Sequence, residues 1–169
     1  MRTHRANRML KGKIKSAIEL KTIIQRLKKQ NKTIVFTNGC FDLLHYGHVQ
    51  FLEEAKQKGD FLVVGINSDS SVKKIKGPNR PVVREEGRIR TVAALESVDY
   101  AIIFKEKTPL KLIKLLKPDI LVKGADWNKN AIVGKEIVSG HGGKVESIKL
   151  IPGYSTSNLI QKIGKIPKK

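Results

Sequence analysis

The 169-residue sequence is poor in cysteine, in aromatic residues and in long apolar runs. Its single cysteine, Cys40, excludes a disulfide framework and a zinc site built from several cysteines, and it favours a reducing, cytoplasmic setting. The longest apolar runs, at residues 61–66 and 101–104, are far shorter than the roughly 20 residues that a membrane span needs. The basic N-terminus has no apolar core, so a secretory signal is not expected.

Acidic residues are also scarce, with 15 against 34 lysines and arginines, which gives a formal net charge of +19. Residues 1–32 hold 11 of the basic residues and one acid, Glu19. Such charge suits nucleic acid, an anionic membrane surface or small phosphorylated substrates, or is simply solvated surface lysine. Aromatic residues make up only 5%, which is little for stacking on single-stranded bases. A basic nucleic-acid-binding module therefore stays an alternative without a motif to support it.

What the sequence does contain is a regular alternation of two apolar patterns. Short continuous apolar runs indicate buried strands, and apolar residues at helical spacing indicate helices. The predicted strands are 33–37, 61–67, 100–104, 119–122 and 144–151. The predicted helices are 13–30, 48–58, 86–98, 108–116, 131–139 and 155–163, with a polar loop at 68–81. This order predicts an α/β fold, a Rossmann-like doubly wound parallel sheet with helices on both faces.

The organisation along the chain is expected to be a single domain with an N-terminal basic helix. Its parts are a basic leader and helix at residues 1–31 and the sheet-bearing domain at 32–169. In doubly wound folds, ligands bind beyond the carboxyl ends of the strands, where the strand order reverses. The segments in which to look for a site are therefore those that follow predicted strands, namely 38–48, 67–81, 123–127 and 152–157.

The segment 38–48 reads NGCFDLLHYGH and contains neither a GxGxxG fingerprint nor a P-loop. His45 and His48 lie three residues apart around Gly47, where a helix is expected to begin. Two imidazole donors over the free N–H groups of a helix N-terminus would clamp a triphosphate. The alternatives are structural histidines or a metal site. Cys40 and the two histidines offer only three metal ligands, so no metal site is predicted.

Residues 39–48 (GCFDLLHYGH) resemble the signature of the HxGH nucleotidyltransferases, the cytidylyltransferase-like superfamily. Further matches follow in order at 67–69, 76–82, 88, 121–127 and 155–160, so the resemblance covers roughly residues 20–163. It is strongest to the D-glycero-β-D-manno-heptose 1-phosphate adenylyltransferases, which often form one half of a bifunctional kinase–transferase. The resemblance implies a nucleotidyltransferase-type fold and transfer of AMP from ATP to that sugar 1-phosphate. The products would be pyrophosphate and ADP-heptose, a precursor of lipopolysaccharide and other surface glycans.

The resemblance also implies roles for single residues. The catalytic residues would be His45, His48, Lys76 and Arg80. The nucleotide-binding residues would be Asn38, Gly39, Cys40, Phe41, Gly47, His48, Lys123, Asp126, Ser155, Thr156 and Ser157. The acceptor-binding residues would be Asp42, Asn67, Asp69, Lys73 and Arg80, with Lys74 as a further candidate among the loop lysines. It further implies Mg²⁺ bound mainly through the triphosphate, a homo-oligomer, and no specific nucleic acid partner.

Several of these residues could instead have a purely structural role. Asp42 and Asp69 could cap turns, Ser155 could cap a helix, and the loop lysines could be solvated. The nucleotide is also open, because cytidylyl transfer to glycerol 3-phosphate or a similar alcohol phosphate uses related motifs. Cytidylyltransferases of that kind carry Arg-Thr ahead of Gly-Ile-Ser-Thr, and residues 150–156 lack the arginine. This departure favours adenylyl transfer.

Overall fold

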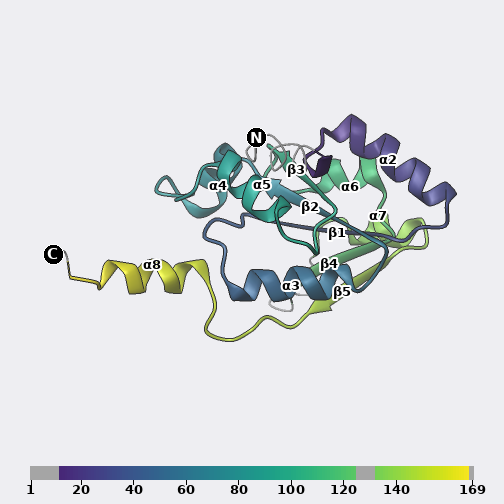
Figure 1. Cartoon of the computed structure of the whole chain (residues 1–169). Helices are drawn as coiled ribbons and strands as arrows, with labels where there is room; N and C mark the ends of the chain where they lie inside the picture. The colour runs from purple at the N-terminus through teal and green to yellow at the C-terminus, as the bar shows by residue number, and fades with distance from the viewer. Residues whose placement is uncertain (1–11, 125–131, 168–169) are drawn as a thin grey trace, which may run out of the picture.

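The computed structural model describes residues 12–124 and 132–167, and its centre is a parallel sheet of five strands (Figure 1). The strands are β1 (Ile34–Gly39), β2 (Phe61–Asn67), β3 (Tyr100–Phe104), β4 (Ile120–Gly124) and β5 (Lys144–Ile148). Their order in the sheet is β3-β2-β1-β4-β5, and every pair is parallel. The chain order reverses between β1 and β4, so the predicted doubly wound α/β fold is confirmed, and the ligand edge lies where these two strands end.

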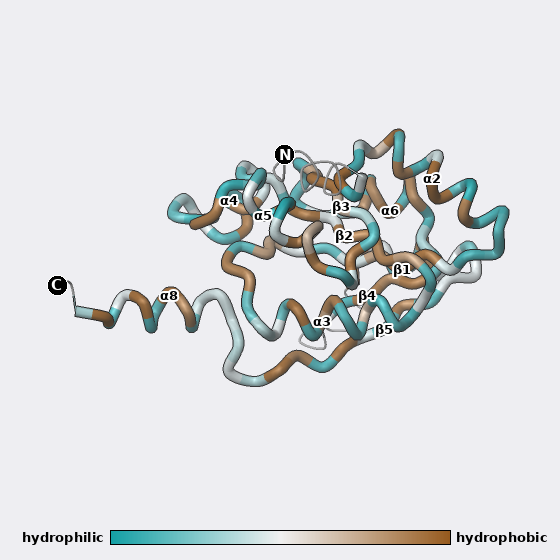
Figure 2. The backbone as a smooth tube through the Cα atoms, in the orientation of Figure 1, coloured by the Kyte–Doolittle hydropathy of each residue, from teal (hydrophilic) through white to brown (hydrophobic). Residues whose placement is uncertain are grey.

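Helices cover both faces of the sheet. They are α2 (Ala17–Lys29), α3 (Tyr46–Lys56), α4 (Asp69–Lys76), α5 (Glu85–Ala93), α6 (Leu110–Leu116), α7 (Lys135–Gly140) and α8 (Thr156–Gly164). One apolar core cluster joins the sheet to α2, α6 and α7, and a second joins it to α3 and α5. Figure 2 shows the hydrophobic residues concentrated along the strands between these layers. The cores thus fix the strands from both sides, as a buried parallel sheet requires.

The basic N-terminal helix belongs to the first of these cores. Ser16 caps α2 through a capping box with Glu19. Leu20, Ile24 and Leu27 on the inner face of the helix are buried in the cluster that also contains α6. Core packing therefore continues across the composition boundary predicted at residue 31.

Five elements differ from the sequence prediction by three residues or more, and one of them is the helix predicted at 86–98, which ends at Ala93. The predicted polar loop 68–81 contains α4, a polar helix that the Ser68 side chain caps and whose buried members are only Ser71 and Val72. Residues 13–16 do not join the first helix, because Ile14 instead forms a parallel bridge to Ala101 of β3. The strand predicted at 144–151 ends at residue 148, and the helix predicted at 131–139 begins at residue 135.

Three aspartates fix the strands at the amino edge of the sheet, opposite the ligand edge. They are Asp60, Asp99 and Asp119, each directly before a strand. Each accepts a hydrogen bond of 2.7–2.8 Å from a backbone N–H at the start of a neighbouring strand. Each also pairs with a lysine ammonium. Strand register is therefore secured at this edge by side chains as well as by the ladder.

The last helix is the exception to the layered packing. In Figure 1, α8 lies beside the body of the domain rather than on a face of the sheet. No residue of α8 is buried, although Figure 2 shows apolar residues along it. Among the described residues, every helix is too short or too polar to span a lipid bilayer.

The packing of α2 makes a direct prediction. Replacing Leu20, which has no exposed surface, by alanine is expected to lower the free energy of unfolding by about 2–5 kcal/mol, because it leaves a cavity in the core. The matched control on the same helix is Ile18→Ala, because Ile18 is 79% exposed and its loss is expected to cost about 0.5 kcal/mol or less. Urea denaturation monitored by circular dichroism measures both. Equal effects would contradict the placement of α2 in the core.

Candidate active site

The site begins where β1 runs into α3. His45 is the N-cap residue of α3, in an extended conformation, and His48 lies in the first turn of the helix. Their imidazole rings stack with centroids 3.8 Å apart and an angle of 19° between the planes. The spacing in the sequence therefore does bring both rings to one side of the helix start, as predicted.

Each imidazole has one ring nitrogen without a partner in the part of the chain that the structure describes. The Nδ1 atoms of His45 and His48 are buried and form no hydrogen bond with any residue that the structure describes. Burial lowers the pKa of His45, and burial together with the neighbouring His45 lowers the pKa of His48 from 6.5 to about 4. Both rings are therefore neutral at neutral pH, and they lie ready to hydrogen-bond a ligand at the positive end of α3.

The chain passes close to its neighbours between the two histidines, so a side chain at residue 47 would be crowded. A Cβ atom at Gly47 would lie 3.1 Å from Cβ of Tyr154 and 3.2 Å from Nδ1 of His45. Tyr154 also packs edge-on against Tyr46, with ring centroids 5.3 Å apart. Sequence reasoning gave no role to Tyr154, and the only signal for it is its position just before the serine-rich segment 155–157.

That C-terminal segment meets the histidine loop. The Ser155 side chain accepts a hydrogen bond of 3.1 Å from the Asn158 N–H and so caps α8, which is the structural role weighed for it. Thr156 donates from Oγ1 to the Leu43 carbonyl at 3.5 Å, while Ser157 is exposed. The predicted second phosphate cradle thus lies next to the first, with its hydroxyls at a helix N-terminus.

Asp42 faces the protein rather than the solvent. Its carboxylate is 1% exposed, pairs with Arg80 Nε at 2.7 Å and accepts hydrogen bonds from the N–H groups of Val82 and Val83. Burial alone would raise the pKa of Asp42, but the hydrogen bonds from Val83, Val82 and Arg80 outweigh it and hold the pKa below its ordinary value. With its oxygens engaged in this way, Asp42 is better explained as an organiser of segment 80–83 than as the acceptor ligand that was predicted.

A second buried charge, Arg88 of α5, ties the loops of the site together. Its guanidinium donates to the carbonyls of Cys40, Asn67 and Val83 and pairs with Asp69 at 2.9 Å. The family resemblance in the sequence included Arg88 among its matching residues but implied no role for it. Its partners lie 5 to 48 residues away in the chain, so no local pattern reveals them.

The segment after β2 presents the predicted acceptor residues. Asn67 is buried and donates from its amide to Ser71 Oγ, and Asp69 is held by Arg88, so both have structural contacts. Lys73, Lys74 and Lys76 are exposed on α4. Burial raises the pKa of Cys40, and the positive charges of Lys76, Arg88 and Arg80 oppose this effect.

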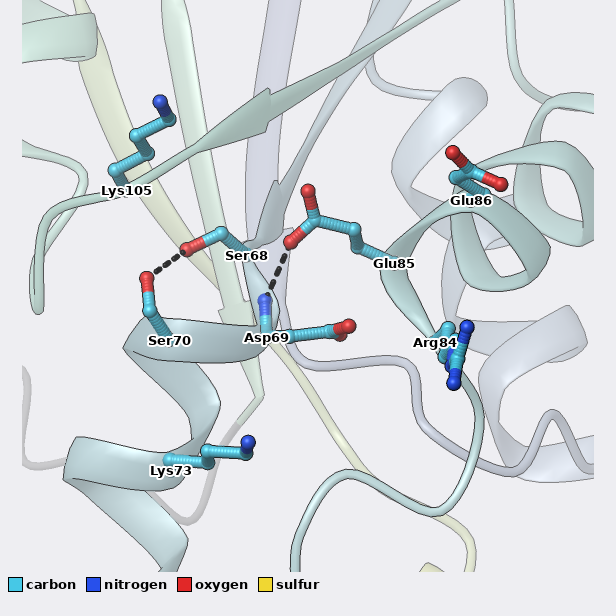
Figure 3. A pocket seen from close by; sticks show the side chains of 8 residues that line it. All are labelled: Ser68, Asp69, Ser70, Lys73, Arg84, Glu85, Glu86 and Lys105. Carbon is cyan, nitrogen blue, oxygen red and sulfur yellow. Dashed lines mark hydrogen bonds between the residues drawn. The ribbon is translucent and has the colours of Figure 1, made fainter.

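An open hollow of about 520 Å³ lies beside this segment, between the starts of α4 and α5 and the end of β3 (Figure 3). Its charged lining residues are Asp69, Lys73, Arg84, Glu85, Glu86 and Lys105. Glu85 already accepts a hydrogen bond of 2.6 Å from the Asp69 N–H, drawn as a dashed line in Figure 3. The exposed cations Lys73, Arg84 and Lys105 form no ion pair with the described residues, so they can meet an anion from solution.

On the other side of the switch point, Lys123 at the end of β4 is 9% exposed and donates to the Asn38 side chain of β1. The contact joins two residues that are predicted to bind the nucleotide and that lie on the neighbouring strands β1 and β4. Asp126, the third predicted residue of this edge, lies outside the described residues. Within the described part of the chain no group of three or more His, Cys, Asp or Glu side chains is arranged to hold a metal ion.

A doubly wound sheet with paired imidazoles at its switch point and a hydroxyl-bearing helix start beside them defines a nucleotide-binding α/β protein. A family model described as cytidylyltransferase-like matches residues 36–162. The chain therefore belongs to the cytidylyltransferase-like family, which confirms the resemblance and the expected nucleotidyltransferase class.

Curated relatives support this placement. The bifunctional protein HldE of Geobacter metallireducens is 52% identical over 152 residues, which cover 90% of this chain and 31% of that protein. HldE of Campylobacter jejuni subsp. doylei is 56% identical over 151 residues, with 89% and 31% covered. The chain thus spans about a third of the length of the curated relatives that it matches.

Solved structures give the same fold. The lipopolysaccharide core biosynthesis protein of Thermoplasma volcanium is 31% identical with a TM-score of 0.59, and the match covers 71% of this chain and 97% of that one. The pantoate-beta-alanine ligase of Francisella tularensis has a TM-score of 0.58 at 17% identity and covers 91% and 78%. The second likeness bears on the fold alone.

The depressed pKa of His48 predicts a loss of stability in acid. The unfolded chain takes up a proton near pH 6.5, but folded His48 does so only near pH 4. The contribution of neutral His48 to stability is therefore complete above pH 6.5 and is lost as the pH falls toward 4.

Urea denaturation of the wild type and of His48→Gln at about pH 7.5 and about pH 5 tests this. The wild type is expected to lose more stability between the two pH values, because glutamine does not titrate in this range. Parallel losses in the two proteins would contradict the buried, neutral state of His48.

Proposed function

We propose that the chain transfers AMP from ATP to a sugar 1-phosphate, D-glycero-β-D-manno-heptose 1-phosphate, and releases pyrophosphate. The product, ADP-heptose, would serve the synthesis of lipopolysaccharide or related surface glycans. The observation that carries the proposal is the stacked pair His45 and His48 at the start of α3, whose Nδ1 atoms have no partner among the described residues. The substrate is supported by identities near 50% to proteins named HldE and by a 31% identical structure named for lipopolysaccharide core biosynthesis.

The chemistry needs little from a general base. The acceptor is already an anionic phosphate oxygen, which attacks the α-phosphorus of ATP in line with the leaving pyrophosphate. The barrier is then lowered chiefly by alignment and by stabilising the charge that grows on the triphosphate. A neutral imidazole can serve as a hydrogen-bond donor here, because one of its two ring nitrogens carries a proton that can meet a phosphate oxygen.

Cationic side chains would complete the charge balance. Arg80 is held by Asp42 through its Nε, which leaves the terminal nitrogens of the fork for a phosphate. Lys76 and Lys73, exposed on α4, would contact the triphosphate and the acceptor phosphate. Lys123, Asn38 and the hydroxyls at the start of α8 would bind the nucleotide on the other side.

We further propose that Mg²⁺ enters with ATP as part of the substrate. Two carboxylates of the candidate site already have partners: Asp42 is paired with Arg80, and Asp69 with Arg88. A magnesium ion coordinated mainly by triphosphate oxygens and water fits a site of this composition.

A turnover matrix tests the proposed reaction. The purified chain is incubated with ATP or CTP and with heptose 1-phosphate or glycerol 3-phosphate, and pyrophosphate release is measured. Release only with ATP and heptose 1-phosphate is the expected outcome. Dependence on CTP would instead support cytidylyl transfer, the alternative that the description of the family keeps in view.

Replacing His48 by alanine is expected to lower turnover on the order of 100-fold, because it removes a donor to the reacting phosphates. His141 provides the matched control, since it lies at the C-terminal end of α7 with its ring at 2.9 Å from the Pro118 carbonyl. His141→Ala is expected to retain turnover within about twofold. A wild-type rate in the His48 variant would remove that residue from the mechanism.

We also propose that the chain acts as a homo-oligomer, with a second copy covering α8. The helix has no buried residue, and Ile163 is 59% exposed, so the apolar side of the helix is left uncovered by the residues that the structure describes. Ile163→Asp is expected to shift the sedimentation coefficient of the wild-type oligomer toward that of a monomer. Gln161→Asp, on the same helix with the same added charge, is the control. A monomeric wild type would contradict this proposal.

A further inference from the structure

Arg88 is the largest fully buried side chain of the molecule's described part, with 1% of its surface exposed. A buried guanidinium is costly unless its donors are satisfied, and here they contact three separate segments of the site. Nε donates to Val83, Nη1 to Cys40, and Nη2 to Asn67 and Asp69, over distances of 2.5–2.9 Å. The proposed reaction uses Arg88 in no step. Its contacts with several segments of the candidate site therefore need another explanation.

The contact with the Cys40 carbonyl fixes the direction of a peptide group. The Cys40–Phe41 bond is trans, because Arg80–Pro81 is the cis bond of the described chain. In a trans peptide the carbonyl oxygen and the following N–H point in opposite directions. With the Cys40 oxygen turned inward to Arg88 at 2.5 Å, the Phe41 N–H is turned away from the core.

The conformation of Phe41 supports this orientation. Its φ of 45° lies in the left-handed region, which a phenylalanine rarely adopts and which costs energy. Its ring is buried, packs over Gly39, and lies 5.2 Å from the ring of His48. Among the described residues the Phe41 N–H has no hydrogen-bond acceptor. The chain thus holds a strained peptide in place with a free donor beside the histidine pair.

We propose that Arg88 is a positioning residue for the nucleotide. By holding the Cys40 carbonyl inward, its guanidinium presents the Phe41 N–H to a phosphate oxygen of the bound triphosphate. The same guanidinium fixes Asn67, Asp69 and Val83, so the loops on both sides of the nucleotide keep one arrangement. This inference rests on nucleotide binding at the histidine loop and does not depend on which sugar accepts the nucleotidyl group.

The direct test is the amide signal of Phe41. The chain contains five phenylalanines, so labelling with ¹⁵N-phenylalanine gives a nitrogen–proton spectrum with few signals. The signal of Phe41 is the one that disappears in Phe41→Leu. Adding a non-hydrolysable ATP analogue to the wild type is expected to shift it, because its N–H acquires an acceptor. A Phe41 signal that does not move at saturating analogue would overturn the proposal.

The role of Arg88 is tested by Arg88→Lys, which keeps the charge but cannot donate to three carbonyls in a fork. We expect the nucleotide-induced shift of Phe41 to be lost and kcat to fall on the order of 100-fold, since small misplacements at a reacting centre are costly. We expect a smaller change in the KM for the acceptor. The matched control is Arg90→Lys, because Arg90 lies on the same helix and is exposed. It should keep both the shift and the rate.

Thermal unfolding shows whether the variants are folded. Should Arg88→Lys fail to fold, Arg88→Gln replaces it, because glutamine keeps an amide donor and buries no charge. A folded Arg88 variant with a wild-type shift and a wild-type kcat would exclude a positioning role. A wild type whose Phe41 signal shifts with the ATP analogue, but which makes no nucleotide sugar from heptose 1-phosphate, would contradict the proposed function and leave this inference standing.

Discussion

The buried guanidinium of Arg88 is the interaction on which the shape of the site depends. It joins the segments that follow β1 and β2 to the segment that precedes α5, and these are the segments that border the ligand edge of the sheet. Asp42 performs a related task from the opposite direction, since it binds segment 80–83 from the histidine loop. One buried cation and one buried anion, each bound by backbone groups and by one charged side chain, thus hold three loops in a single arrangement.

The two histidines show how the fold prepares polar groups for a ligand. Stacked rings at 3.8 Å, both partly removed from water, favour the neutral state and leave their Nδ1 atoms without partners among the described residues. A phosphate bound there, as proposed, would displace no hydrogen bond of these two atoms to the described residues. The cost of holding the unpartnered atoms is borne by the folded protein in advance, which is the general requirement for a preorganised site.

The sheet and the helix that carries the two histidines could be predicted from the sequence. Buried runs such as residues 61–67, separated by amphipathic segments, sufficed for the parallel sheet, because both faces of such strands must be apolar. The spacing of His45, Gly47 and His48 was enough to predict that the two rings lie together at the start of a helix. Helix α4 was missed because it is short and polar, with Val72 as its only buried apolar residue. Arg88 and Asp42 could not be explained from sequence, because arginine and aspartate are usually exposed and their partners here are distant in the chain.

The aspartates at the amino edge of the sheet have a consequence for how this scaffold can diversify. Asp60, Asp99 and Asp119 anchor the strand beginnings through backbone contacts and lysine partners. These contacts align the strands at the amino edge of the sheet. The loops at the ligand edge therefore contribute less to that alignment. The loops at the ligand edge can then change in length and composition while the sheet keeps its structure. Related proteins with this fold could therefore come to bind different substrates through changes in the loops at the ligand edge alone.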